Sequence, residues 1–175
     1  MKDIVFVTGN EHKLKEFEHI LGKTLISEPL DLPEIQSFDL EKVASYKAEE
    51  AYKILQKPVM VEDTGFYVEV LNGFPGPFVK YMEQTMGDAK MGIMFEGSSA
   101  KARTCIAYFD GRQVHTFVGE TEGKIVPSRG PTGFGFASIY EVGGKTHAEM
   151  SKEEKSKKSQ RSRAIEKFKK FLESK

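Results

Sequence analysis

The stretch Val59-Met60-Val61-Glu62-Asp63-Thr64-Gly65 joins a short apolar run to two adjacent acids and a turn-forming Thr-Gly pair. The apolar run predicts a buried β-strand, and the alternating residues 66–70 predict a half-buried strand after it. Two carboxylates at a strand end are unfavourable if they are merely buried. They make chemical sense if they bind a hard cation or move protons, and Mg²⁺ prefers oxygen ligands. A solvated acidic turn is the other interpretation.

An N-terminal segment supplies a second candidate site. Residues 3–8 predict a buried strand that ends at Thr8-Gly9-Asn10, with Asn10 as the N-cap of a following helix. One face of that helix carries Leu14, Phe17 and Leu21. Backbone N–H groups at a helix start favour anions, and Lys13 lies on the first turn. Phosphate binding is therefore one interpretation, and an ordinary strand-to-helix turn is the other. The Gly-x4-Gly-Lys-Ser/Thr spacing of a P-loop is absent.

The rest of the chain alternates predicted helices and strands. The expected helices are 40–55, 78–86, 88–96 and 152–172. The expected strands are 25–26, 103–109, 113–120, 123–126 and 138–142, with a hairpin turn at Asp110-Gly111. Early strand–helix alternation combined with an antiparallel hairpin predicts an α/β fold with a mixed twisted sheet and flanking helices. The length of 175 residues predicts one domain, 1–175.

Composition narrows the class of protein. Lys and Arg total 26, as do Asp and Glu, so the zero net charge gives no argument for a nucleic-acid or membrane partner. Cys105 is the one cysteine, which excludes an internal disulfide and fits a cytoplasmic location. No apolar run approaches the roughly 18 residues of a membrane span. The histidines have no metal-ligand spacing and are expected to be surface or structural residues: His12, His19, His115 and His147.

Two further segments allow a functional and a structural interpretation. Residues 152–175 carry ten Lys or Arg and four Glu, which is most often a solvated basic helix face. That face can also supply phosphate-binding charges from Lys155 and Arg161, or form a nucleic-acid patch. The glycine-rich residues 130–133 lead into Phe134-Gly135-Phe136. These aromatic rings either stack on a planar base or pack in the core.

Five segments, taken in order, resemble the inosine triphosphate pyrophosphatase family (the Ham1-like NTP pyrophosphatases) over almost the whole chain. They are Thr8-Gly9-Asn10-x-x-Lys13, Asp31-Leu32-Pro33-Glu34-Ile35-Gln36, Val61-Glu62-Asp63-Thr64-Gly65, Gly73-Phe74-Pro75-Gly76-Pro77-Phe78-Val79-Lys80, and Thr146-His147-Ala148-Glu149-Met150 followed by Glu153-Glu154-Lys155-Ser156. Any one of these motifs is weak, but five in the same order are specific.

The resemblance implies an elongated, two-lobed domain with a central cleft that works as a homodimer. It implies an enzyme that hydrolyses non-canonical purine nucleoside triphosphates (ITP, dITP and XTP) to the monophosphate and pyrophosphate, and so cleanses the nucleotide pool. Mg²⁺ is the implied cofactor, with Glu34, Glu62 and Asp63 as its ligands. Asp63 and Glu62 are the implied catalytic residues, and Asp63 would position or deprotonate the attacking water.

The resemblance also implies a set of substrate-binding residues. They are Thr8, Gly9, Asn10, Glu11, His12, Lys13, Lys47, Thr64, Lys80, Phe134, Gly135, Phe136, Ala137, Lys155, Gln160 and Arg161. The four lysines would supply positive charge along the triphosphate, Phe134 would stack on the base, and Arg161 would help to recognise the 6-oxo group. Lys47 is predicted on a helix, so a solvated surface lysine is the other interpretation for it.

Two positions depart from the family pattern. The family usually reads Phe-Gly-(Tyr or Trp)-Asp and Ser-His-Arg, where this chain has Phe134-Gly135-Phe136-Ala137 and Ser159-Gln160-Arg161. Ala137 cannot accept a hydrogen bond from a purine N1–H, which we expect to weaken base discrimination by roughly 1–3 kcal/mol. The alternatives are a Maf-like pyrophosphatase of other nucleotides, a nucleotide-binding protein with reduced or no turnover, and a nucleic-acid-binding protein.

Overall fold

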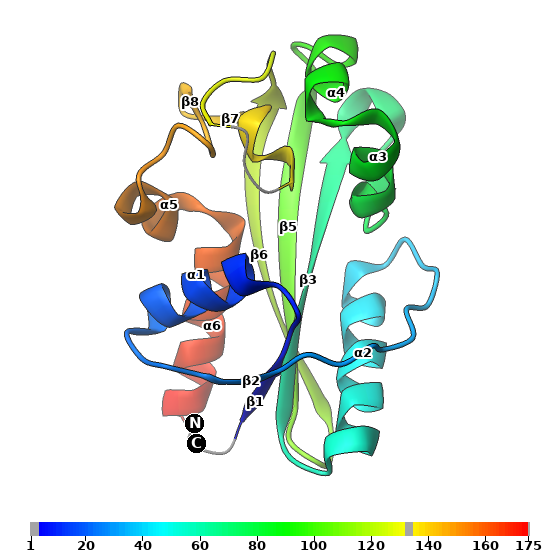
Figure 1. Ribbon diagram of the computed structural model, residues 1–175, viewed down its shortest axis with the longest axis vertical. Coiled ribbons are helices and arrows are strands. Elements are labelled where there is room, and N and C mark those ends of the chain that lie inside the picture. Colours follow the sequence, from blue (N-terminus) through cyan, green and yellow to red (C-terminus); the bar gives the residue numbers. More distant parts are fainter. Residues whose placement is uncertain (1–3, 132–134, 175) are drawn as a thin grey trace.

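The structure is a computed structural model that describes residues 4–131 and 135–174. One mixed sheet forms the long axis of an elongated molecule (Figure 1). Its strand order is β2-β1-β3-β5-β6-β7-β8, and β4 pairs separately with β3. The strands are β1 (Val5–Val7), β2 (Ile26–Glu28), β3 (Val59–Val68), β4 (Pro75–Gly76), β5 (Ser99–Phe109), β6 (Val114–Ile125), β7 (Tyr140–Val142) and β8 (Lys145–Thr146).

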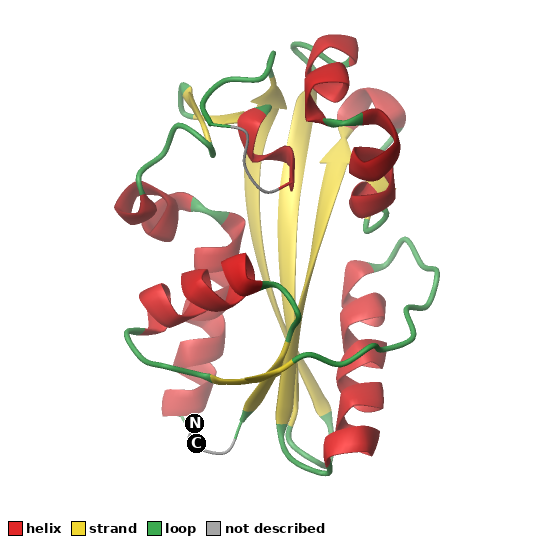
Figure 2. Ribbon diagram, in the orientation of Figure 1, coloured by secondary structure: helices red, strands yellow, loops and turns green. Residues whose placement is uncertain are grey.

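Helices cover both faces of the sheet at one end of the molecule and gather around its other end (Figure 2). They are α1 (Glu11–Leu21), α2 (Leu40–Leu55), α3 (Val79–Met86), α4 (Asp88–Met94), α5 (Lys152–Lys158) and α6 (Gln160–Glu173), with the 3₁₀ turns η1 (Glu69–Leu71) and η2 (Gly135–Ser138). At the end where the chain termini lie, α1 and α6 pack on one face and α2 packs on the other (Figure 1). The α/β fold with a mixed sheet and flanking helices is therefore confirmed.

The alternation of side chains along β3 decides which helices each residue meets. Met60 packs in the cluster that contains Phe17 of α1 and Phe168 of α6. Val59 and Val61 pack in the cluster that contains alanines of α2. Beyond the acids, β3 enters a third cluster at the other end of the molecule, which includes Phe66, Met91, Phe136 and Tyr140. The long strands β3, β5 and β6 thus join two lobes with separate cores (Figure 1).

Several element boundaries differ from the sequence expectation. The acids at 62–63 do not end β3, because all ten of its residues pair with β5. The strands expected at 113–120 and 123–126 are one strand, β6, and 138–142 divides into the end of η2 and β7. The helix expected at 152–172 breaks at Ser159, whose extended backbone (φ −73°, ψ 156°) caps α6 through its side chain. Local polar residues were mistaken for strand ends, whereas pairing with long neighbours keeps the strands continuous.

One edge of β3 is interrupted in a way that creates space beside the acids. On that edge, β1 pairs with Val59 and Met60, and β4 pairs with Phe66 and Tyr67. In the described part of the chain, no strand pairs with residues 61–65 on this side. The carboxylates of Glu62 and Asp63 therefore sit at a gap between two short edge strands. No helix among residues 4–131 and 135–174 combines the length and apolar character that crossing a membrane requires.

Candidate active site

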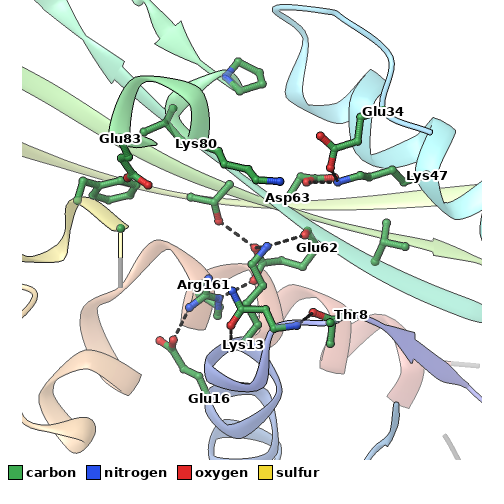
Figure 3. A pocket seen from close by; sticks show the side chains of 18 of the residues that line it. Thr8, Lys13, Glu16, Glu34, Lys47, Glu62, Asp63, Lys80, Glu83 and Arg161 are labelled. Atoms are coloured by element: carbon green, nitrogen blue, oxygen red, sulfur yellow. Dashed lines mark hydrogen bonds and ion pairs between the residues drawn. The ribbon is translucent and has the colours of Figure 1, made fainter. Parts of the chain in front are cut away.

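A cavity of about 720 Å³ opens at this gap and is lined by both lobes. The expected site residues that line it are Thr8, Gly9, Asn10, Lys13, Glu34, Lys47, Glu62, Asp63, Thr64, Lys80, Gly135, Phe136, Ala137, Lys155, Gln160 and Arg161. Glu11 and His12 are not among the lining residues, and Phe134 lies outside the described residues. Segments that are far apart in sequence thus meet in one cleft (Figure 3).

Glu62 is a fully buried carboxylate that is held by cations. Arg161 donates from Nε to Glu62 Oε2 at 2.6 Å, and Lys13 Nζ lies 3.2 Å from Oε1. Lys13 also donates to the Glu62 backbone carbonyl at 3.0 Å, which satisfies an acceptor on the unpaired edge of β3. Burial alone would raise the pKa of Glu62, but Arg161 and Lys13 outweigh it and lower the pKa to about 2.

Arg161 is committed to two carboxylates. Its Nη1 pairs with Glu16 of α1 in addition to the Nε contact with Glu62. Burial opposes the charged form, yet the two acids raise the pKa of Arg161 further above its usual range. The position of Arg161 is set by the first turn of α6, which lies against Gly119 of β6. A Cβ at Gly119 would be 2.0 Å from the Gln160 carbonyl oxygen, so the close approach requires glycine there. In this structure Arg161 organises the acids, and the expected contact with a 6-oxo group remains a prediction.

Asp63 faces the opposite side of the sheet from Glu62, as adjacent strand residues must. Lys47 of α2 bridges it to Glu34, with its Nζ 2.8 Å from Asp63 Oδ1 and 2.5 Å from Glu34 Oε1. The Lys47 side chain is only 16% exposed, so it is not a solvated surface lysine. Burial opposes its charge, but Asp63 and Glu34 raise its pKa. Glu34 is partly desolvated, yet Lys47 lowers its pKa.

Some of these acids are suited to bind a magnesium ion, and others are already paired. No group of three or more His, Cys, Asp or Glu side chains converges as a ready-made metal site within residues 4–131 and 135–174. However, Asp63 Oδ2 is buried without a hydrogen-bond partner in the described part of the chain, and the Glu34 side chain beside it is 41% exposed. Mg²⁺ is typically held by one or two carboxylates together with substrate phosphates, and these oxygens match that ligand set. The oxygens of Glu62 are occupied by Arg161, Lys13 and Thr64.

The junction between β1 and α1 is capped by its own residues. Asn10 Oδ1 accepts hydrogen bonds from the backbone N–H groups of His12 (3.0 Å) and Lys13 (3.2 Å), so the expected N-cap is confirmed. Thr8 Oγ1 accepts from Asn10 N at 3.1 Å. Glu11 pairs with Lys15 on the solvent side of α1. The side chains of Glu11 and His12 are exposed and do not line this cavity, so their place in the substrate site stays a prediction.

The far end of the cavity is formed by α3, η2 and the start of α6. Phe136 stacks on Phe66 with ring centroids 4.2 Å apart, so its ring packs in the core while the residue borders the cavity. Glu83 of α3 faces this end, and its Oε1 is buried without a hydrogen-bond partner. Burial, together with the nearby charge of Asp88, raises the pKa of Glu83 to about 7. Gln160 is buried there, and its Oε1 accepts a long hydrogen bond from Thr121 at 3.5 Å.

Residues 4–171 match the Ham1 family. The chain belongs to the Ham1 family. It is 45% identical to the inosine triphosphate pyrophosphatase of Kluyveromyces lactis over 97% of this chain and 95% of that protein. It is 40% identical to the dITP/XTP pyrophosphatase of Methanosarcina acetivorans over the full length of both. The structure of a Ham1 protein from Coxiella burnetii superposes with a TM-score of 0.81 at 26% identity, covering 100% of both chains.

The sequence analysis of this Ham1-family protein did not place Glu16, His147 or Glu83 in the site, and all three line the cavity. Glu16 lies one turn after Lys13 on α1, and that spacing is the signal that could have placed both beside the acids. His147, expected at the surface or in a structural role, is buried, borders the cavity and meets Tyr140 edge-on. Burial lowers the pKa of His147 to about 4, with Lys155 and Arg161 adding to the effect, so it is neutral at pH 7. Glu83 lies one turn after the expected site residue Lys80 on α3, and the same spacing could have placed it beside the cavity.

Proposed function

We propose that this chain hydrolyses ITP, dITP and XTP to the nucleoside monophosphate and pyrophosphate. The observation that carries the proposal is a single cavity that combines four lysines with a buried, unpartnered carboxylate oxygen of Asp63. The lysines are Lys13, Lys47, Lys80 and Lys155. The names of the relatives from Kluyveromyces lactis and Methanosarcina acetivorans support the same substrates.

In the proposed reaction, Asp63 acts on the attacking water. Its Oδ1 is fixed by Lys47, which leaves Oδ2 to accept a hydrogen bond from water and to take its proton. The water oxygen forms a bond to the α-phosphorus as the bond to the bridging α–β oxygen breaks. Pyrophosphate departs with that electron pair. The fixed orientation of Asp63 lowers the entropic cost of bringing water and phosphorus together.

The lysines and the outer acids hold the substrate and the charges. Positive side chains around the triphosphate would offset the negative charge that grows on the leaving oxygen. Glu34 would hold the Mg²⁺, which when bound would neutralise phosphate oxygens, while Asp63 Oδ2 serves the attacking water. Glu62 holds Lys13 and Arg161 in place, so its proposed role is to orient cations around the substrate.

Pyrophosphate release from a panel of nucleoside triphosphates tests this proposal. We expect release from ITP and XTP in the presence of Mg²⁺, with much lower rates for ATP and dTTP, and no release after chelation by EDTA. Release from pyrimidine nucleotides alone would favour the Maf-like alternative. Nucleotide binding without release would favour a protein that binds but does not hydrolyse.

The proposal also includes the oligomeric state of the protein and its location in the cell. We propose a homodimer, as the family resemblance implies, and large exposed apolar side chains such as Phe38 and Tyr81 are candidates for its interface. Light scattering coupled to size-exclusion chromatography would test the dimer, since a monomer at micromolar concentration would contradict it. We also propose a cytoplasmic location, which fractionation of cells would test.

A further inference from the structure

Glu83 is a carboxylate in the cleft that the proposed reaction does not use. It lies one turn after Lys80 on α3, so the two side chains leave the helix on the same face. The Lys80 side chain runs toward Asp63, whereas Glu83 lies on the other side of Lys80, away from Asp63 and Glu34 (Figure 3). Glu83 therefore belongs to the part of the cavity that Lys80 separates from Asp63 and Glu34 (Figure 3).

The Glu83 carboxylate lines the cavity and lies against the backbone of Phe136, which lowers its pKa less than burial and Asp88 raise it. Its Oε1 is buried and makes no hydrogen bond with the residues that the structure describes. It lies over Gly135 of η2, where a Cβ would come within 3.2 Å of Oε1, and φ of +64° also favours glycine at that position. A buried acceptor that lacks a hydrogen bond costs about 1–3 kcal/mol. Such a group in a binding pocket is expected to be satisfied by a ligand.

The surroundings of Glu83 suit a flat organic ring better than a phosphate. Val79, Phe136 and Ala137 supply apolar lining beside it. Asp88 is the charged group that acts on Glu83 from α4, and it is negative, so it disfavours an anion here. Apolar walls with a few oriented polar groups are typical of sites for aromatic ligands. Because the triphosphate would occupy the lysine end, the base falls at this end.

We propose that Glu83 reads the edge of the base, its carboxylate accepting a hydrogen bond from the N1–H of a 6-oxopurine. This inference rests on the proposed function and names the specificity residue of the same site. Hypoxanthine and xanthine carry a hydrogen on N1, whereas N1 of adenine is an acceptor. An ionised carboxylate is acceptor-only, so it pairs with the former and not with the latter. Glu83 thereby supplies from α3 the acceptor that Ala137 cannot provide.

The pH dependence of selectivity separates this role from simple packing. The ionised form of Glu83 accepts from an oxopurine, and its protonated form can donate to adenine N1. The ratio of kcat/KM for ITP to that for ATP should therefore rise as pH increases through about 7, the pKa of Glu83. His147 is already neutral in this range, because burial lowers its pKa to about 4.

The experiment compares wild type with Glu83→Leu and Glu83→Gln between pH 6 and 8.5. Glu83→Leu should lower kcat/KM for ITP by roughly 10- to 100-fold and change that for ATP by less than about 3-fold. Glu83→Gln, which can either donate or accept, should abolish the pH dependence of the ratio. The matched control is Glu69→Leu, an exposed acid in η1 outside the cavity, which should leave both values unchanged.

Equal losses for ITP and ATP in Glu83→Leu would overturn the inference, as would a pH-dependent ratio that persists in Glu83→Gln. If wild type releases pyrophosphate from no purine triphosphate, the proposed function fails separately. Calorimetric binding of IMP and AMP then tests Glu83 directly. A preference for IMP over AMP that disappears in Glu83→Leu supports the assignment, and an unchanged preference overturns it.

Discussion

The two ends of the cleft each contain a buried carboxylate, yet their surroundings are opposite. Glu62 faces Arg161 and Lys13, which lower its pKa to about 2. Glu83 has no hydrogen-bond partner on Oε1 and lies near Asp88, and burial raises its pKa to about 7. Burial opposes the charged form of both acids, and the comparison teaches that the cations around Glu62 outweigh burial, whereas Asp88 adds to its effect at Glu83. We therefore expect the Glu62 end to bind anionic phosphates and the Glu83 end to bind a neutral hydrogen-bond donor.

The largest expected effect is at the acid on the phosphate side. Asp63→Asn keeps the shape of the side chain but removes the proton acceptor. We expect kcat for ITP to fall by roughly 10²- to 10⁴-fold, because a positioned general base contributes that much. Steady-state pyrophosphate release measures it, with circular dichroism as the control for folding. Activity within about 3-fold of wild type would remove Asp63 from the role of base.

Removing the arginine that pairs with Glu62 should lower the stability of the protein. Arg161→Met leaves Glu62 and Glu16 buried without their shared partner. The expected loss is about 3–5 kcal/mol in the free energy of unfolding, the cost of stranding a buried charge. Urea denaturation measures it, and the double variant Arg161→Met with Glu62→Gln should recover part of the loss. An Arg161→Met loss below about 1 kcal/mol would mean that water reaches these acids.

A smaller effect is expected at the lysine that joins Glu34 to Asp63. Lys47→Met should lower kcat/KM for ITP by roughly 10- to 100-fold, because a positive charge next to the triphosphate is lost. Lys53 is the matched control, since it is on the same helix but pairs with Glu50 at the surface. Lys53→Met should leave kcat/KM unchanged and have little effect on stability, because an exposed ion pair contributes little. Similar kcat/KM values for the two variants would contradict a substrate role for Lys47.

The smallest expected effect is in the pH dependence of stability, which follows from the opposite pKa shifts of Glu83 and Glu62. The folded state holds the proton of Glu83 up to about pH 7, whereas the unfolded chain releases it near pH 4.5, so wild type loses stability between these values. Glu83→Gln should therefore be more stable than wild type above pH 7, by about 1–2 kcal/mol. The sign is reversed for Glu62, whose contribution is complete above pH 4.5 and disappears as pH falls toward 2. Urea titrations across pH 2–8 measure both; equal pH dependence in wild type and Glu83→Gln would contradict the assignment.

Local sequence determined the elements that depend on short-range patterns. Helical spacing placed α2, the capping ability of Asn10 placed the start of α1, and the Asp110-Gly111 turn placed the β5–β6 hairpin. The same local patterns pointed to the acids and lysines that line the cavity. Burying a charged residue beside an apolar strand is unfavourable unless the charge is paired or binds a ligand. The predicted strand ends were wrong in β3 and β6, because continuous pairing with β5 extends both strands through their polar residues.

Only the tertiary structure decided how those residues divide their tasks. Glu62 and Asp63 are neighbours in sequence, but the two-residue period of a strand sends them to opposite faces, one toward Arg161 and the other toward Lys47. Glu16 and Glu83 line the cavity one turn after Lys13 and Lys80, and only the packing of α1 and α3 around β3 shows that these helix faces meet the acids. A sequence lists which side chains are available for chemistry. The partners that set their charge come from packing across tens of residues, and that is a property of the fold.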